Sequence, residues 1–205
     1  MPIPMQKYCD FDLQTIKKKI GESITWRPSN ISENILTGES LNKAAVLVPL
    51  VVCHDKVNLL FTLRSSSLER HSSQVSFPGG IFENDDKSLI DTALRETREE
   101  IGVDKKNIQV IGQLPSFNTS TGYIVYPVIG VIDSLDNIRI NEIEVNKVFY
   151  IPLDWLCNPN HSKLENYVTV DGTNIKVWFF DQYEGESVWG ITAKIIFDLI
   201  EILKR

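Results

Sequence analysis

Three glutamates in the segment 95–100 have the chemistry and spacing needed to hold a metal ion. Glu96, Glu99 and Glu100 follow one another at i, i+3 and i+4, and each residue of a helix advances by about 100°. On a helix the three carboxylates would share a face and repel one another. A shared divalent cation would relieve that repulsion, and oxygen ligands of this kind suit Mg²⁺ or Mn²⁺. The segment therefore predicts a Mg²⁺ or Mn²⁺ site at Glu96, Glu99 and Glu100.

Two adjacent glutamates on a helix more often form a plain solvated face, but the surroundings favour the metal site. Gly79 and Gly80 follow a strand and would let the backbone turn tightly beside the glutamates. Arg95 is expected to orient a glutamate through a charge-assisted bidentate contact. Asp86, at the start of the helix, would either assist a metal or cap the helix, and capping is the favoured role. Gly102 is expected to end the helix.

The elements that must position these residues follow from the apolar periodicity. Ile90, Leu94, Thr97 and Ile101 form a stripe that would pack on a sheet, with the glutamates on another face. Short apolar runs predict strands, and longer amphipathic runs predict further helices. The expected helices are 10–20, 87–101 and 188–203, and the expected strands are 44–52, 57–64, 107–114, 123–132, 145–153, 167–170 and 175–180. This order predicts an α/β (mixed α+β) fold with helices packed on a mixed sheet.

Composition places the chain among globular proteins. Its 205 residues are 42% hydrophobic and 23% charged, which is enough for one domain with a sizeable core. The net charge of −6 argues against broad nucleic-acid binding and against a basic membrane-binding surface. The three cysteines, distant in sequence, predict neither a zinc site nor a disulfide. Without a secretory signal or an apolar run of about 18 residues, the chain is expected to be cytoplasmic.

The motif around the glutamates resembles the Nudix box. In that family a glycine is followed by a glutamate, then by Arg-Glu, then by Glu-Glu and a further glycine. Gly80, Arg95-Glu96, Glu99-Glu100 and Gly102 match this order. Asp86 stands where the first glutamate is expected, one residue further than usual from Arg95, and Thr97 replaces an apolar residue.

A second resemblance is to the coenzyme A pyrophosphatase-like Nudix proteins. The segment 59–80 is similar to the signature that precedes their box, and the likeness extends over about residues 44–200. Glu69 and Ser73 depart from that signature, where an arginine and a glycine are expected. Arg70, next to the first of these, is expected to take the place of the missing arginine. The residues that match the signature are Leu60, Thr62, Arg64, Ser65 and 77–80.

The resemblance implies a Nudix-type α/β/α sandwich with a mixed sheet at 44–205, preceded by an extension at 1–43. It also implies metal-dependent hydrolysis of a diphosphate bond. One of the three glutamates, or Glu144 from a later loop, would act as general base. Arg64 either binds phosphate or pairs with a surface acid; Arg70, Gly79 and Gly80 are the other expected substrate contacts. Dimers are common in the family, which suggests a homodimer.

Three functions compete at this point. The first is hydrolysis of coenzyme A or a derivative to 3′,5′-ADP and 4′-phosphopantetheine. The second, suggested by Glu69 and Ser73, is hydrolysis of ADP-ribose, NADH or a nucleoside triphosphate. The third is a nonenzymatic nucleotide-binding module, which the retained glutamates disfavour.

Overall fold

A computed structural model of the chain describes residues 11–23, 42–65, 74–119, 122–136, 138–169 and 172–205. Its helices are α1 (Leu13–Ser23), α2 (Leu89–Ile101), α3 (Leu153–Leu156) and α4 (Gly190–Lys204). Its strands are β1 (Asn42–Cys53), β2 (Lys56–Arg64), β3 (Val75–Ser76), β4 (Gly79–Ile81), β5 (Ile108–Gln113), β6 (Phe117–Asn118), β7 (Tyr123–Ile132), β8 (Val145–Pro152), β9 (Ser162–Val168) and β10 (Asn174–Phe180).

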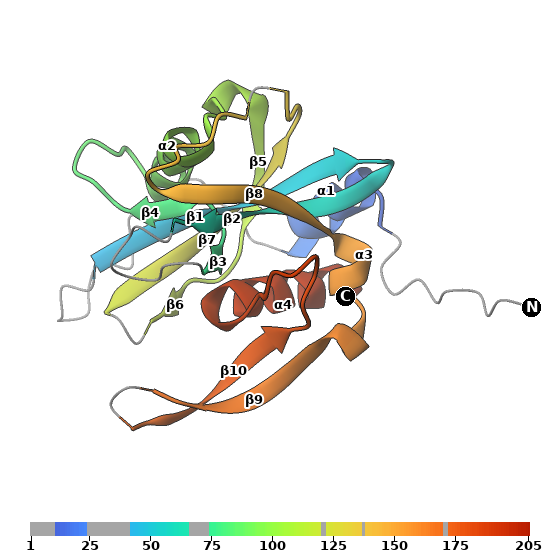
Figure 1. Cartoon of the computed structure of the whole chain (residues 1–205). Helices are drawn as coiled ribbons and strands as arrows, with labels where there is room; N and C mark the ends of the chain where they lie inside the picture. Colours follow the sequence, from blue (N-terminus) through green and yellow to red (C-terminus); the bar gives the residue numbers. More distant parts are fainter. Residues whose placement is uncertain (1–10, 24–41, 66–73, 120–121, 137, 170–171) are drawn as a thin grey trace, which may run out of the picture.

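An 8-stranded mixed sheet forms the centre of the molecule. Its main path runs β3-β2-β1-β7-β5, and β4, β6 and β8 join at β1, β7 and β2. The β1–β7 pair is parallel and the other pairs are antiparallel. Helix α2 covers one face of the sheet, and α1 and α4 cover the other (Figure 1). The predicted mixed α/β sandwich is confirmed.

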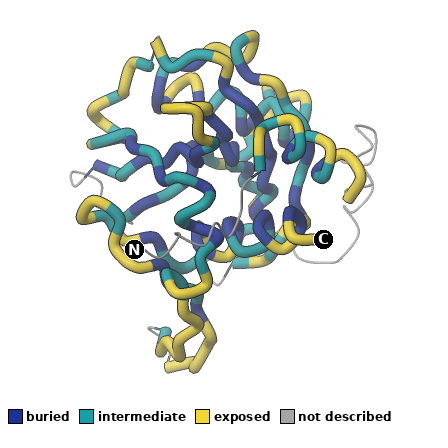
Figure 2. The backbone as a smooth tube through the Cα atoms, turned by 90° about the vertical axis from the view of Figure 1, so that its right-hand side faces the viewer, coloured by how far each residue is buried: buried dark blue, intermediate teal, exposed yellow. Residues whose placement is uncertain are grey.

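Alternating side chains of the central strands supply both cores. In β1, Leu47 and Val51 pack with Ala93 and Ile101 of α2. The intervening Val48 and Leu50 belong to the opposite core, together with residues of α1 and α4. A strand buried on both faces gives an almost continuous apolar run instead of an alternating one. This explains why β1, β2 and β7 are apolar along most of their length. Figure 2 shows that buried segments of the backbone gather in the interior of the molecule.

Helix α1 is part of this architecture. Ile16 and Ile20 are fully buried in the core that also contains α4. The division into an extension at 1–43 and a domain at 44–205 stays a prediction, although β1 begins at Asn42.

A second sheet, the β9–β10 hairpin, projects beyond α4 (Figure 1). Residues of β9 are mostly exposed, whereas Val177 and Phe180 of β10 are buried. The sequence predicted both strands, but β9 begins earlier than the expected 167.

One prediction about the cysteines is wrong. Cys157 is buried and disulfide-bonded, and Cys53 is free. Separation along the chain does not limit which cysteines meet in the folded state, so spacing could not exclude the bond. The disulfide also removes one argument for a reducing compartment. Within the described ranges, no helix is long and apolar enough to cross a membrane.

Candidate active site

Helix α2 carries the glutamates and is capped at both ends. Ser88 is the N-cap, and its Oγ accepts a hydrogen bond from the Asp91 N–H. Gly102 ends the helix with φ 74°, a left-handed conformation that glycine adopts without strain. The prediction that Asp86 caps the helix is therefore wrong, because Ser88 takes that position.

The helix is also rotated relative to the predicted stripe. Ile90 and Leu94 are half-buried, whereas Leu89 and Ala93 are buried with Ile101. This rotation carries Glu100 to the inner side of α2, where only 3% of the residue is exposed. The glutamates consequently do not share one solvated face. The side chains of Glu96 and Glu99 are 14% and 51% exposed.

The carboxylate of Glu100 contains one of two buried polar atoms that lack a partner among the described residues. The Gly79 N–H donates a hydrogen bond to it, but Oε2 is buried without a partner among the described residues. Its pKa is raised to about 8, chiefly by burial; the negative charges of Glu96 and Glu144 also raise the pKa, and the positive charge of Arg64 lowers it. Removing a carboxylate from water without a partner is unfavourable. A cation beside Oε2 would supply the missing partner.

Arg64 lies at the end of β2, where the register with β8 shifts between Leu63 and Arg64. Its Nε is buried and has no hydrogen-bond acceptor among the described residues, and its charge acts on Glu100. The sequence left open whether Arg64 pairs with a surface acid. The charge of Arg64 acts on Glu100 and its Nε is an unused donor, which suits an anionic group.

Two glycines allow the strand β4 to approach the site closely. A Cβ on Gly80 would lie 2.7 Å from Oε2 of Glu96, and a Cβ on Gly79 would lie 2.6 Å from Cα of Val46. Gly80 therefore leaves room for the Glu96 carboxylate, and Gly79 leaves room for the backbone of β1. The backbone at Gly79 and Gly80 therefore passes close to Glu96, as the sequence predicted.

Arg95 contacts the glutamates as expected, but its strongest partner is Asp86. Its Nε and Nη2 donate to the two oxygens of Asp86 at 2.9 and 3.0 Å. Its Nη1 donates to Glu96 at 2.9 Å and to Glu99 at 3.0 Å. Because every one of its nitrogens is engaged, Arg95 holds carboxylates in place and has little capacity left for a substrate.

Asp86 is in turn held by hydrogen bonds from three residues. Besides Arg95, it accepts hydrogen bonds from the Thr92 hydroxyl at 2.9 Å and from the Glu83 N–H at 3.0 Å. The bond from Arg95 is the main reason that its pKa is lowered to about 2. Asp86 therefore links the loop before α2 to the arginine that holds Glu96 and Glu99.

We expect Asp86→Asn to lower the free energy of unfolding by about 2 kcal/mol at pH 7, because it removes charge-assisted hydrogen bonds from a side chain that is 5% exposed. A lowered folded-state pKa stabilises the protein above the unfolded value of about 3.8 and loses this contribution as pH falls through about 2. Chemical denaturation at pH 7 and at lower pH should show the difference shrinking. Asp85→Asn, at the exposed neighbouring position, is the control; an equal loss in both variants would contradict the assignment.

Glu144 reaches the site from the loop between β7 and β8. Its charge raises the pKa of both Glu96 and Glu100. The loop is tied to the end of α2, since the N–H groups of Arg139 and Asn141 donate to the Ile101 and Glu100 carbonyls, each at 2.9 Å. The fold thus brings Glu144 and Arg64, distant in sequence, to the helix of the glutamates. Arg70, Glu69 and Ser73 lie outside the described residues.

Within the described ranges, no group of three His, Cys, Asp or Glu side chains is arranged to hold a metal ion. Glu99 is turned toward Arg95. The residues nevertheless fit a divalent cation, because the buried Oε2 of Glu100 has no partner and Glu96 and Glu144 add negative charge beside it.

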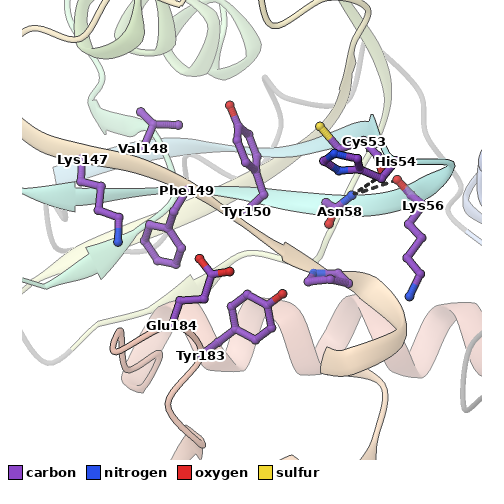
Figure 3. A pocket seen from close by; sticks show the side chains of 11 residues that line it. Cys53, His54, Lys56, Asn58, Lys147, Val148, Phe149, Tyr150, Tyr183 and Glu184 are labelled. Carbon is purple, nitrogen blue, oxygen red and sulfur yellow. Dashed lines mark hydrogen bonds between the residues drawn. The ribbon is translucent and has the colours of Figure 1, made fainter. Parts of the chain in front are cut away.

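A separate hollow of about 460 Å³ lies along β8, with Cys53 and His54 at one end and Lys147 at the other (Figure 3). Among the described residues, none of the predicted site residues lines it. Its lysines are paired, Lys56 with Asp154 at 3.0 Å and Lys147 with Glu186 at 3.1 Å. The hollow therefore offers no unpaired lysine for a phosphate.

Sequence reasoning missed three residues here. Ser88 carries the ordinary signal of an N-cap, a serine before the first helical residue. Asn141 precedes Glu144 by three residues, a spacing typical of a side chain that hydrogen-bonds within a turn. Arg139 carries no comparable signal, because it contributes only its backbone N–H.

Comparison with known proteins agrees with this geometry. The NUDIX domain family matches residues 41–172. The chain is 40% identical over 162 residues to a Photorhabdus laumondii protein named "Uncharacterized Nudix hydrolase NudL", covering 77% of this chain and 83% of that protein. A Citrobacter koseri protein of the same name is 41% identical over 170 residues, covering 80% and 85%. The crystal structure of an Enterococcus faecalis MutT/nudix family protein has a TM-score of 0.55 at 17% identity, covers 84% of this chain and 66% of its own, and shows the same fold.

Proposed function

Because the chain belongs to the Nudix hydrolase family, whose members hydrolyse diphosphate bonds, we propose that its substrate is coenzyme A or a derivative. The products would be 3′,5′-ADP and 4′-phosphopantetheine. The observation that carries the catalytic part is the buried, unpartnered Glu100 carboxylate beside Arg64, Glu96 and Glu144. The choice of coenzyme A is supported by the sequence of the segment 59–80.

Nudix hydrolases generally use divalent metal ions. We infer that Glu96, Glu99 and Glu100 hold Mg²⁺ or Mn²⁺, with Glu99 released from Arg95 to do so. When bound, the ion would lower the pKa of water and neutralise charge on the diphosphate oxygens. Arg95, braced by Asp86, keeps Glu96 directed toward the site.

Two further residues would act on the substrate and on water. A water oxygen attacks one phosphorus, and the bond from that phosphorus to the bridging oxygen breaks, so that each product keeps one phosphate of the diphosphate and 3′,5′-ADP also keeps its 3′-phosphate. Glu144 accepts the proton of the attacking water, as a general base at the edge of the carboxylate cluster. Arg64 donates from its unused Nε to a diphosphate oxygen, which matches its burial and its lack of a protein acceptor.

A comparison of substrates tests the assignment. With Mg²⁺ or Mn²⁺, we expect kcat/KM for coenzyme A to exceed that for ADP-ribose and NADH by at least about tenfold, a difference of about 1.4 kcal/mol. Dephospho-coenzyme A is the matched control for Glu69, whose charge would oppose a 3′-phosphate. Faster turnover of ADP-ribose than of coenzyme A would reassign the substrate to the second class that Glu69 and Ser73 suggest.

A cytoplasmic location and a homodimer are also part of the proposal. Fractionation of cells and light scattering on the purified protein test them separately from the activity.

A further inference from the structure

Asn141 makes hydrogen bonds that fix both the backbone and the carboxylate of Glu144. Its carbonyl accepts from the Glu144 N–H at 3.0 Å, and its Oδ1 accepts from the Ile143 N–H at 3.2 Å. Its Nδ2 donates to Oε1 of Glu144 at 3.2 Å. Asparagine commonly forms such local turns with its own side chain, but the third bond reaches the functional group itself.

The same residue is anchored to the helix of the glutamates. Its N–H donates to the carbonyl of Glu100 at 2.9 Å. The last carbonyls of a helix have no partner inside the helix, so this bond satisfies α2 while it fixes the loop. One residue therefore connects the backbone of Glu100 to the side chain of Glu144.

We propose that Asn141 is a positioning residue, whose amide N–H holds the Glu144 carboxylate in the orientation required to take a proton from water. The inference rests on the proposed function, in which Glu144 is the general base. Only one oxygen of Glu144 is engaged by Asn141, and the other is left for the proton. The loop backbone and this hydrogen bond together set the direction in which the Glu144 carboxylate points.

Two substitutions separate this role from that of the turn. Asn141→Asp keeps Oδ1 as the acceptor for the Ile143 N–H, but it has no side-chain N–H to offer Glu144. Asn141→Ala removes both bonds. We expect Asn141→Asp to lower kcat at least tenfold with KM changed less than threefold, because general bases contribute about 10²–10⁴-fold.

The unfolding midpoint of the metal-free protein should fall more for Asn141→Ala than for Asn141→Asp. Asn146→Asp, at an exposed asparagine of the neighbouring strand, is the matched control and should keep the wild-type kcat.

A double-mutant cycle with Glu144→Gln tests whether Asn141 acts through Glu144. Residues that act through one group are not additive. In the Glu144→Gln background, Asn141→Asp should change kcat by less than about twofold. Glu142→Gln, at an exposed carboxylate of the same loop, controls for the loss of a charge and should keep kcat unchanged.

The outcomes distinguish this inference from the proposed function. If Glu144→Gln is impaired and Asn141→Asp keeps the wild-type kcat, the positioning role is wrong and the proposed function stands. An equal loss from Asn141→Asp in both backgrounds also overturns it, because Asn141 would then act independently of Glu144. If Glu144→Gln retains full kcat, Glu144 is not the base and the inference fails with that assignment. Product identity with coenzyme A tests the substrate in all three cases.

Discussion

Replacing Glu100 by Gln is expected to reduce hydrolysis more than about 100-fold and to stabilise the metal-free protein at alkaline pH. Even outer-shell partners of metal ligands contribute about 10–100-fold to affinity or activity, and Glu100 is proposed as a ligand itself. The same carboxylate is unfavourable without the ion, since it is buried with Oε2 unpartnered. Glu100→Gln should therefore lower the hydrolytic activity and raise the stability of the metal-free protein.

The raised pKa of Glu100 determines how the stability difference between Glu100→Gln and the wild-type protein changes with pH. Burial raises the pKa of Glu100 from about 4.5 to about 8. A raised folded-state pKa stabilises the protein fully below the unfolded value, and this contribution is lost as pH rises through about 8. Gln has no such loss, so its advantage in unfolding free energy should be larger at pH 9 than at pH 5 by more than about 1 kcal/mol, the equivalent of one pKa unit.

Denaturant unfolding with a chelator at pH 5, 7 and 9 measures the stability, and steady-state hydrolysis with Mg²⁺ measures the activity. Glu142→Gln, on the exposed part of the loop, should change neither. A Glu100→Gln protein that is active would show that Glu100 is not a required metal ligand. One whose stability shows the wild-type decline with pH would show that Glu100 is not an uncompensated buried carboxylate.

The substitution Gly80→Ala, which adds one methyl group, is expected to reduce hydrolytic activity about 10–100-fold with little change in stability. The new Cβ would lie within 2.7 Å of Oε2 of Glu96 and must displace that carboxylate. The end of a glutamate side chain can move at small energetic cost, so the fold should tolerate the change. The displaced carboxylate would no longer be held at its place beside Arg95 and the other glutamates.

Gly79→Ala is the matched comparison, because its Cβ would meet the backbone of Ala45 and Val46 instead of a side chain. Overpacking against backbone costs about 1–3 kcal/mol or more, so this variant should lose stability. Thermal unfolding and kcat measured on both proteins separate the two effects. If Gly80→Ala keeps wild-type activity, the position of Glu96 does not matter for hydrolysis.

The central strands and the helix that carries the three glutamates could be predicted because their signals are local. Strands buried on both faces give continuous apolar runs, as in β1 and β7. Helix α2 has an apolar periodicity and ends at a glycine, both of which are visible in the sequence. The short strands β3, β4 and β6 have no such pattern, because pairing with β2, β1 and β7 alone defines them.

The environment of each site residue could not be predicted in the same way. Helical spacing places Glu96, Glu99 and Glu100 near one another, but it does not say which side of α2 the sheet and the later loop cover. Those contacts bury Glu100 and leave Glu99 half exposed. The role of Asp86 depends on where Arg95 points, and the position of Arg64 depends on a register shift at the end of β2.

The most direct test of the central claim is the identity of the products from coenzyme A. The purified protein is incubated with coenzyme A and Mg²⁺ or Mn²⁺, and the phosphate-containing products are separated and identified, with Glu100→Gln in parallel. We predict that the wild-type protein releases 3′,5′-ADP and 4′-phosphopantetheine and that the variant releases neither at a comparable rate. Intact coenzyme A with the wild-type protein, or equal release by the variant, would contradict the account.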